Sequence, residues 1–247
     1  MYRQSLALTF RLYPYVLLAV IGEIVIRVLA EKEIVGNSSK GIGISVLYCV
    51  LAFYAHVDIL LPGSKNRKAA STRFVGFMGR NLGLIFLIVL TAGGLTFFLY
   101  YGLDMGTGGD RDERIGEIAL IMLPLAGVFS LLIFGLMGTW MPAYVVNRER
   151  GVGKAFARGK STFWYMVIRL IYGPGLIFVL SLLAFGFLPL LADLPETWFQ
   201  TGWQPNISMF VVSALVYVVQ AWAIVMTAWI FSHAFLETED RPAETGA

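Results

Sequence analysis

The sequence predicts an all-α integral membrane protein with six transmembrane helices. Three observations predict it. Of all residues, 57% are hydrophobic and only 14% are charged, whereas a soluble domain has roughly 45–50% apolar and about 25% charged residues. Six apolar runs are each long enough to cross a bilayer, which takes about 20 residues per helix. The lysines and arginines gather between these runs.

The predicted spans divide the chain into one transmembrane domain, residues 1–236, and a short tail. The spans lie at residues 12–30, 42–61, 82–103, 118–140, 166–191 and 207–235. The first span follows Arg3 and Arg11 as a signal peptide would, but Glu23 and Arg27 interrupt its apolar part and five spans follow, so we expect an uncleaved helix. The acidic tail, residues 237–247, is expected to be disordered.

Two basic connections set the expected orientation, because short loops rich in Lys and Arg stay on the cytoplasmic side. One lies at residues 62–80 and the other at 147–169, where aromatic residues follow the charges. An even number of spans then places both termini in the cytoplasm. The residues expected to contact lipid or a partner are Arg67, Lys68, Arg73, Lys154, Arg158, Lys160 and Trp164.

The two basic connections belong to an internal repeat. Residues 54–96 and 140–184 follow one order: an inward helix, a basic loop, a Ser-Thr pair, aromatic residues, an arginine and the letters Gly-Leu-Ile-Phe. An even number of spans separates the copies, so the repeats are parallel. We therefore expect two helix hairpins, each led by a basic amphipathic segment at the cytoplasmic surface.

The first two predicted spans contain charged residues and a histidine. Glu23 and Arg27 stand one helical turn apart with the acid first, so one helix face can pair them and lower the cost of burial. We expect a structural ion pair, with proton or ion movement as the alternative. His56 and Asp58 lie near the inner end of the second span. We expect them to be interfacial residues bonded to neighbouring helices or water, with a metal or proton-relay role as the alternative.

Gly173, Pro174 and Gly175 interrupt the fifth span and predict a bend or break in its helix. Interrupted helices expose backbone groups that transporters use to hold ions or substrates. That architecture uses such breaks in pairs, and only one is clear in this sequence. We therefore interpret the three residues as a packing kink and a candidate hinge.

The sequence offers no catalytic or cofactor motif. Cys49 is the only cysteine, which excludes disulfide frameworks and Cys-rich metal sites. His56 and His233 are the two histidines, and no HExxH or GxSxG is present. The glycines of residues 104–114 lack the Lys-Ser/Thr ending of a phosphate loop. We expect no enzymatic activity, cofactor or metal, and no nucleic-acid partner, because the net charge of +3 lies in the connections.

One stretch, PAYVVNRERGVGKAFARGKSTFWYMV at residues 142–167, resembles a known family. It is similar to the characteristic segment of six-span bacterial inner-membrane proteins of the glycerophosphodiester phosphodiesterase membrane-domain superfamily and of the YciC type. Gly159 stands where that family usually has Ser. The matching residues are Pro142, Val146, Gly151, Ala155, Phe156 and Arg158. The resemblance implies a bacterial inner-membrane protein that accompanies lipid or envelope functions, without catalytic residues of its own, because the phosphodiesterase activity belongs to a separate soluble domain.

Three classes of function follow. The first is a non-enzymatic accessory or scaffold protein whose basic cytoplasmic segments bind anionic lipid headgroups or another membrane protein. The second is a small transporter or channel for an ion or amphiphile that uses the polar groups of spans 1, 2, 5 and 6. The third is an intramembrane enzyme, which would need a histidine to meet a carboxylate in the fold.

Overall fold

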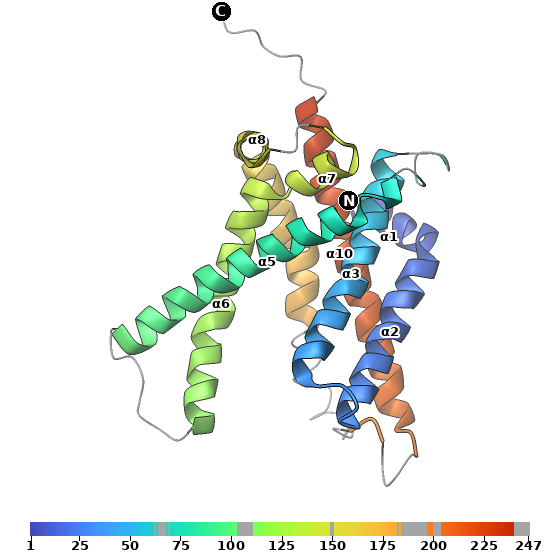
Figure 1. Cartoon of the computed structure of the whole chain (residues 1–247), viewed down its shortest axis with the longest axis vertical. Coiled ribbons are helices and arrows are strands. Elements are labelled where there is room, and N and C mark those ends of the chain that lie inside the picture. Colours follow the sequence, from blue (N-terminus) through green and yellow to red (C-terminus); the bar gives the residue numbers. More distant parts are fainter. Residues whose placement is uncertain are drawn as a thin grey trace, which may run out of the picture. The chain divides into compact units, whose positions relative to one another are not determined.

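The chain is helical throughout the part that the computed structural model describes (Figure 1). Outside the helices and their turns, the described residues include one isolated β-bridge, between Phe199 and Pro205, and no strand. The all-α class predicted from the sequence is therefore confirmed. The described residues are 1–61, 63, 68, 70–102, 111–148, 151–181, 183, 197–199 and 204–239.

Ten helical elements have defined bounds in these residues. They are α1 (Tyr2–Arg11), α2 (Tyr13–Glu31), α3 (Asn37–Leu60), α5 (Phe74–Phe97), the π-helical turn η1 (Phe98–Gly102), α6 (Arg111–Met137), α7 (Trp140–Val145), α8 (Val152–Leu170), the π-helical turn η2 (Ile171–Gly175) and α10 (Ile207–Glu239). After η2 the chain stays helical to Ser181.

Six helices are long and apolar enough to cross a membrane. They run over Tyr13–Glu31, Ser38–Leu60, Phe74–Tyr101, Gly116–Met137, Val152–Ser181 and Ile207–Glu239. The prediction of six membrane-spanning helices is confirmed, and the protein is a polytopic membrane protein. The third and fifth helices begin earlier than the predicted spans, because each helix starts inside the basic segment that precedes its apolar run. Most of residues 182–191, the predicted end of the fifth span, lies outside the described residues.

The fifth helix is long enough to include both the basic segment and the apolar run that follows it. A helix rises 1.5 Å per residue and the hydrocarbon core is about 30 Å thick, so the 30 residues of Val152–Ser181 are about ten more than one crossing needs. Lys, Arg and Ala are good helix formers, so α8 continues through the basic segment although this contains Gly153 and Gly159. The basic first turns of α8 are therefore not needed for the crossing.

The chain divides into two compact units. The first comprises Met1–Phe74 and Ile168–His233, and the second Val75–Val167 and Ala234–Ala247. Within the first unit, α2 packs against α3, with which it forms an antiparallel pair joined by a short turn (Figure 1).

In this first unit α1 is tied to α10 by Trp222, whose Nε1 donates a hydrogen bond to Ser5 Oγ at 3.1 Å. The large, fully buried side chains of the unit come from α2, α3 and α10. They include Glu23, Leu51, Phe53, His56, Tyr217, Met226, Ile230 and Phe231.

In the second unit, glycines allow helices to approach closely. A Cβ on Gly159 of α8 would overlap the backbone carbonyl of Leu136 in α6 and would lie 2.7 Å from its Cα. A Cβ on Gly135 would lie 2.9 Å from Phe163. Small residues at such contacts let helix backbones come together in a membrane. A Ser at position 159, as in the family that residues 142–167 resemble, would not fit this packing.

Arg80 of α5 is held by α7 in the same unit. Its guanidinium lies 3.8 Å from the centroid of the Tyr144 ring and 5.2 Å from that of Trp140. Its Nη1 also donates to the Gly76 carbonyl at 2.9 Å. Arg80 is thus occupied by cation–π contacts and a backbone carbonyl.

The C-terminal helix α10 continues to Glu239, beyond the start of the predicted tail at residue 237. Residues 240–247 lie outside the described part of the chain. The cytoplasmic placement of both termini and the parallel repeat stay predictions.

Candidate functional site

A buried polar cluster lies in the first unit between α2, α3 and α10. Its centre is Glu23, which is 1% exposed. Arg27 donates to Glu23 Oε1 from Nε at 2.9 Å and from Nη2 at 2.7 Å. The pair expected from the one-turn spacing is present in the structure, with the carboxylate buried and the arginine side chain 38% exposed.

The second carboxylate oxygen is occupied as well. Tyr48 of α3 donates its hydroxyl hydrogen to Glu23 Oε2, and the same hydroxyl lies 3.4 Å from Oε1 of Gln220 in α10. The guanidinium of Arg27 lies 5.2 Å from the ring centroid of Tyr217, also in α10. Three helices thus meet at one acid, and both of its oxygens have partners, as a buried carboxylate requires.

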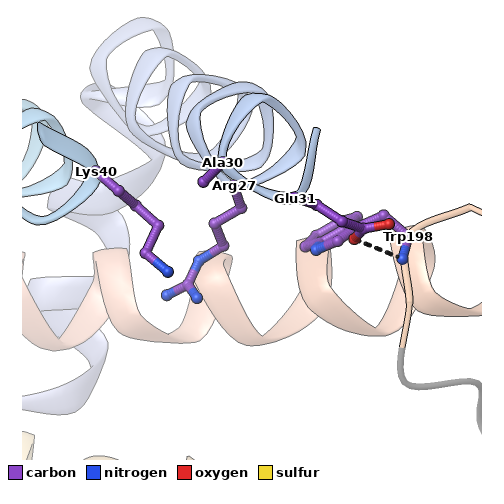
Figure 2. Close-up of a pocket in the computed structure, with 5 residues that line it drawn as sticks. All are labelled: Arg27, Ala30, Glu31, Lys40 and Trp198. Carbon is purple, nitrogen blue, oxygen red and sulfur yellow. Dashed lines mark hydrogen bonds between the residues drawn. The ribbon is translucent and has the colours of Figure 1, made fainter. Parts of the chain in front are cut away.

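A pocket of about 250 Å³ opens beside this cluster (Figure 2). It is lined by Arg27, Ala30 and Glu31 at the end of α2, by Lys40 in the first turn of α3, and by Trp198. Glu31 Oε2 accepts a hydrogen bond from the backbone N–H of Trp198 at 2.9 Å. This bond fixes Trp198 as one wall of the pocket.

His56 and Asp58 have different partners. Nδ1 of His56 lies 2.7 Å from Ser232 Oγ of α10, and both residues are buried. Asp58 forms an ion pair with Arg11, whose Nη2 lies 3.4 Å from its Oδ2. Nδ1 of His233 lies 3.0 Å from the carbonyl of Trp229, one turn earlier in α10. In the part of the chain that the structure describes, no three His, Cys, Asp or Glu residues gather as metal ligands would.

The Gly-Pro-Gly sequence lies within η2, the π-helical turn Ile171–Gly175. Pro174 has no N–H to donate to the helix, and a π-helical turn accommodates such a loss with a local change of hydrogen bonding. Gly173 packs against α10, since a Cβ there would lie 2.7 Å from Met226 Sδ. A hinge motion at Gly173, Pro174 and Gly175 stays a prediction.

The second candidate site is an exposed face of α8 in the second unit. Phe156 is 48% exposed and Trp164 is 71% exposed, and Lys160 between them is exposed too. The spacing of four residues aligns these three side chains along one side of the helix. Lys154 is exposed as well, about a third of a turn around the helix from Lys160. We call Lys154, Phe156, Lys160 and Trp164 the α8 contact face.

Arg158 lies on the opposite, packed side of α8. It is 8% exposed, near Ala155 and Thr162, which are 0% and 2% exposed. Its guanidinium lies 5.4 Å from the centroid of the Phe235 ring. The sequence predicts that Arg158 contacts lipid or a partner. Because Arg158 is buried, we do not include it in the α8 contact face.

The other cations of the basic connections have separate positions. Arg148 forms an ion pair with Glu239, with 2.8 Å between Nη1 and Oε2, so a carboxylate of the same unit already compensates its charge. Lys68 is exposed and Arg73 is partly exposed, both in the first unit. Arg67 lies outside the described residues.

The chain was compared with protein-family models, with curated proteins and with solved structures, and none of these comparisons found a match. The resemblance of residues 142–167 to the glycerophosphodiester phosphodiesterase membrane-domain superfamily stays a prediction. Function must therefore be argued from the two candidate sites. Composition and structure together identify the chain as a polytopic, all-helical membrane protein.

Proposed function

We propose that this protein is a non-enzymatic, multi-pass protein of a bacterial inner membrane that binds anionic lipid headgroups on the cytoplasmic side. The α8 contact face is the binding surface, and the role is that of an accessory or scaffold protein. The observation that carries the proposal is the exposure of Lys160 between Phe156 and Trp164, in the basic part of a helix that has more residues than one crossing needs.

The chemistry of this face matches the headgroup region of a bilayer. Aromatic rings such as that of Trp164 are preferred at the membrane–water interface, and lysines extend their charged ends towards lipid phosphates. Each Lys near an anionic leaflet contributes about 1 kcal/mol. Lys154 and Lys160 together would thus enrich anionic lipid roughly thirtyfold.

A scaffold role is supported by the fourth span, Gly116–Met137. Only 6% of its apolar window is buried within the chain. In a membrane such a surface can meet lipid tails or another apolar helix, because both are equally apolar. We therefore include another integral membrane protein among the proposed partners.

Lipid selectivity tests the proposal. In nanodiscs of neutral lipid with a minor fraction of pyrene-labelled phosphatidylglycerol, energy transfer from tryptophan should exceed that to pyrene-labelled phosphatidylcholine. Replacing Lys154 and Lys160 by Gln should lower the enrichment of the anionic lipid about fivefold for each lysine, because each removes about 1 kcal/mol. Added salt should lower it further by screening the charges.

Lys32→Gln is the matched control. It removes one lysine at the C-terminal end of α2, on the side of the membrane that is expected to face outward. This variant should keep the wild-type enrichment. Equal enrichment of both labelled lipids in the wild-type protein would contradict the proposal. So would an enrichment that is the same with and without the two α8 lysines.

Transport of an ion or amphiphile is the second candidate function. The observation that favours it is the polar cluster, which joins α2, α3 and α10 at Glu23 within the apolar interior. Intramembrane ionisable residues commonly mark transport paths. Because both oxygens of Glu23 and two donors of Arg27 are engaged with each other or with Tyr48, the geometry favours a structural role. Flux across liposomes containing the purified protein separates the two functions.

A further inference from the structure

The pocket beside the polar cluster has two positive groups on one side. Figure 2 shows the ends of Lys40 and Arg27 side by side, facing the same space, although they come from different helices. Two like charges repel each other, and the repulsion is stronger near a low-dielectric membrane than in water. Glu23 offsets part of this repulsion through its pair with Arg27, and an anion between the two groups would offset the rest.

Arg27 already binds the carboxylate of Glu23 and has N–H donors left for a second anion. Its Nε and Nη2 donate to Glu23, which holds the guanidinium in a fixed orientation. A guanidinium has more N–H donors than this pair uses, and the side chain of Arg27 is 38% exposed at the pocket. The outer edge of Arg27 is therefore both positioned and accessible.

Lys40 lies where a cation is unfavourable without an anion. It is in the first turn of α3, at the positive end of the helix dipole, where acidic side chains or bound anions are preferred. Among the residues that the structure describes, none forms an ion pair with Lys40. Its ammonium instead lines the pocket.

The remaining lining residues set the size and net charge of the ligand. Glu31 is engaged with the backbone N–H of Trp198, and Glu23 balances the charge of Arg27, so Lys40 is the lining cation without an ion-pair partner among the described residues. Ala30 and the Trp198 indole add apolar surface. The pocket volume of about 250 Å³ lies below the roughly 300–1,000 Å³ of drug-sized ligand sites. A singly charged group of headgroup size fits these limits.

The place of the pocket along α2 favours a phosphate group. The 19 residues of α2 extend about 28 Å, close to the thickness of the hydrocarbon core, so the last turn of this helix lies at the level of lipid phosphates. We propose that Arg27 and Lys40 together bind the phosphate of an anionic ligand in this pocket. The phosphate comes from a lipid headgroup or from a soluble phosphate in the adjoining water.

This site is separate from the α8 contact face. One span precedes the connection between α2 and α3, and four precede α8, so the two sites are expected on opposite sides of the membrane. The test therefore uses full-length protein in neutral detergent with Lys154 and Lys160 both replaced by Gln. Failure of the α8 proposal then leaves the result for the pocket unaffected.

Two probes distinguish the sources of the phosphate. Inorganic phosphate and short-chain phosphatidylglycerol below its micelle concentration are each titrated, and binding is followed by calorimetry. Binding of both probes indicates a site for soluble phosphate, and binding of the lipid alone indicates a headgroup site. In either case Lys40→Gln should weaken binding by about tenfold or more, since it removes a charged hydrogen-bond donor.

Two further variants test whether the effect is local. Lys32→Gln removes a nearby lysine that lies over the Phe199 ring, at 4.5 Å from its centroid, and does not line the pocket. It should bind like the parent protein. Lys40→Arg keeps the charge and should restore most of the binding lost in Lys40→Gln. The proposal is overturned if neither probe binds, or if Lys40→Gln and its parent bind the probes equally.

Discussion

Replacing Arg27 by leucine should lower the free energy of unfolding by about 3–5 kcal/mol, the usual cost of leaving one partner of a buried ion pair alone. Glu23 would stay 1% exposed, and the Tyr48 hydroxyl would be its one remaining partner from the contacts described above. One neutral hydrogen bond does not replace two donors from a guanidinium. We expect the effect in chemical unfolding of the detergent-solubilised protein.

A double-variant cycle separates the ion pair from the loss of arginine itself. Replacing Glu23 and Arg27 together by leucine removes both charges, and apolar replacement of a buried pair is often neutral or stabilising. The double variant should therefore be more stable than Arg27→Leu. Arg3→Leu, at an exposed position of α1, is the matched control and should change stability by less than about 0.5 kcal/mol. A double variant as unstable as Arg27→Leu would contradict the structural role of the pair.

Replacing Gly159 by alanine should destabilise the second unit by at least about 1–3 kcal/mol, the typical cost of overpacking. The added Cβ would overlap the backbone carbonyl of Leu136. A backbone group cannot turn aside as a side chain can, so α8 would have to move away from the end of α6. The expected result is a lower midpoint of thermal unfolding.

Gly153 provides the control for this substitution, because it lies in the same helix and a Cβ there would meet no atom within 4 Å. Gly153→Ala should leave stability unchanged or raise it by up to about 1 kcal/mol, since alanine favours the helix over glycine. If Gly159→Ala were as stable as Gly153→Ala, the close contact between α8 and α6 would be wrong.

The number of spans could be predicted from the sequence because hydropathy over about 20 residues reports directly on membrane insertion. The starts of the third and fifth helices could not. Hydropathy falls at the charged residues before each apolar run, but hydrogen bonding along a helix does not depend on hydropathy. The helix of the fifth span therefore begins at Val152 rather than at residue 166.

The polar cluster could be predicted only in part. Glu23 and Arg27 are neighbours on one helix, so their spacing sufficed. Tyr48 and Gln220 come from other spans, and the faces that apolar helices turn towards each other cannot be told from their faces towards lipid by hydropathy. The pocket was missed for the same reason, since Lys40 and Trp198 meet only after α2, α3 and the segment before α10 come together.

The contact residues of α8 show the same limit within one helix. The basic segment predicted an interfacial helix, but not which of its cations are packed. Ala155, Gly159 and Thr162 are small residues that form the packed side, and Arg158 lies among them. Small residues at helical spacing are the signal that could have placed Arg158 inward.

The proposed lipid binding on the cytoplasmic side depends on the orientation of the chain across the membrane, and labelling of single cysteines tests this orientation most directly. Cys49 is the only cysteine and is 1% exposed, so a Cys49→Ser background can carry one new cysteine at an exposed position. With a membrane-impermeant maleimide on spheroplasts, Ser39→Cys should be labelled from outside. Ser71→Cys and Gly151→Cys should be labelled only after the membrane is opened. Labelling of Ser71→Cys and Gly151→Cys from opposite sides would contradict the account.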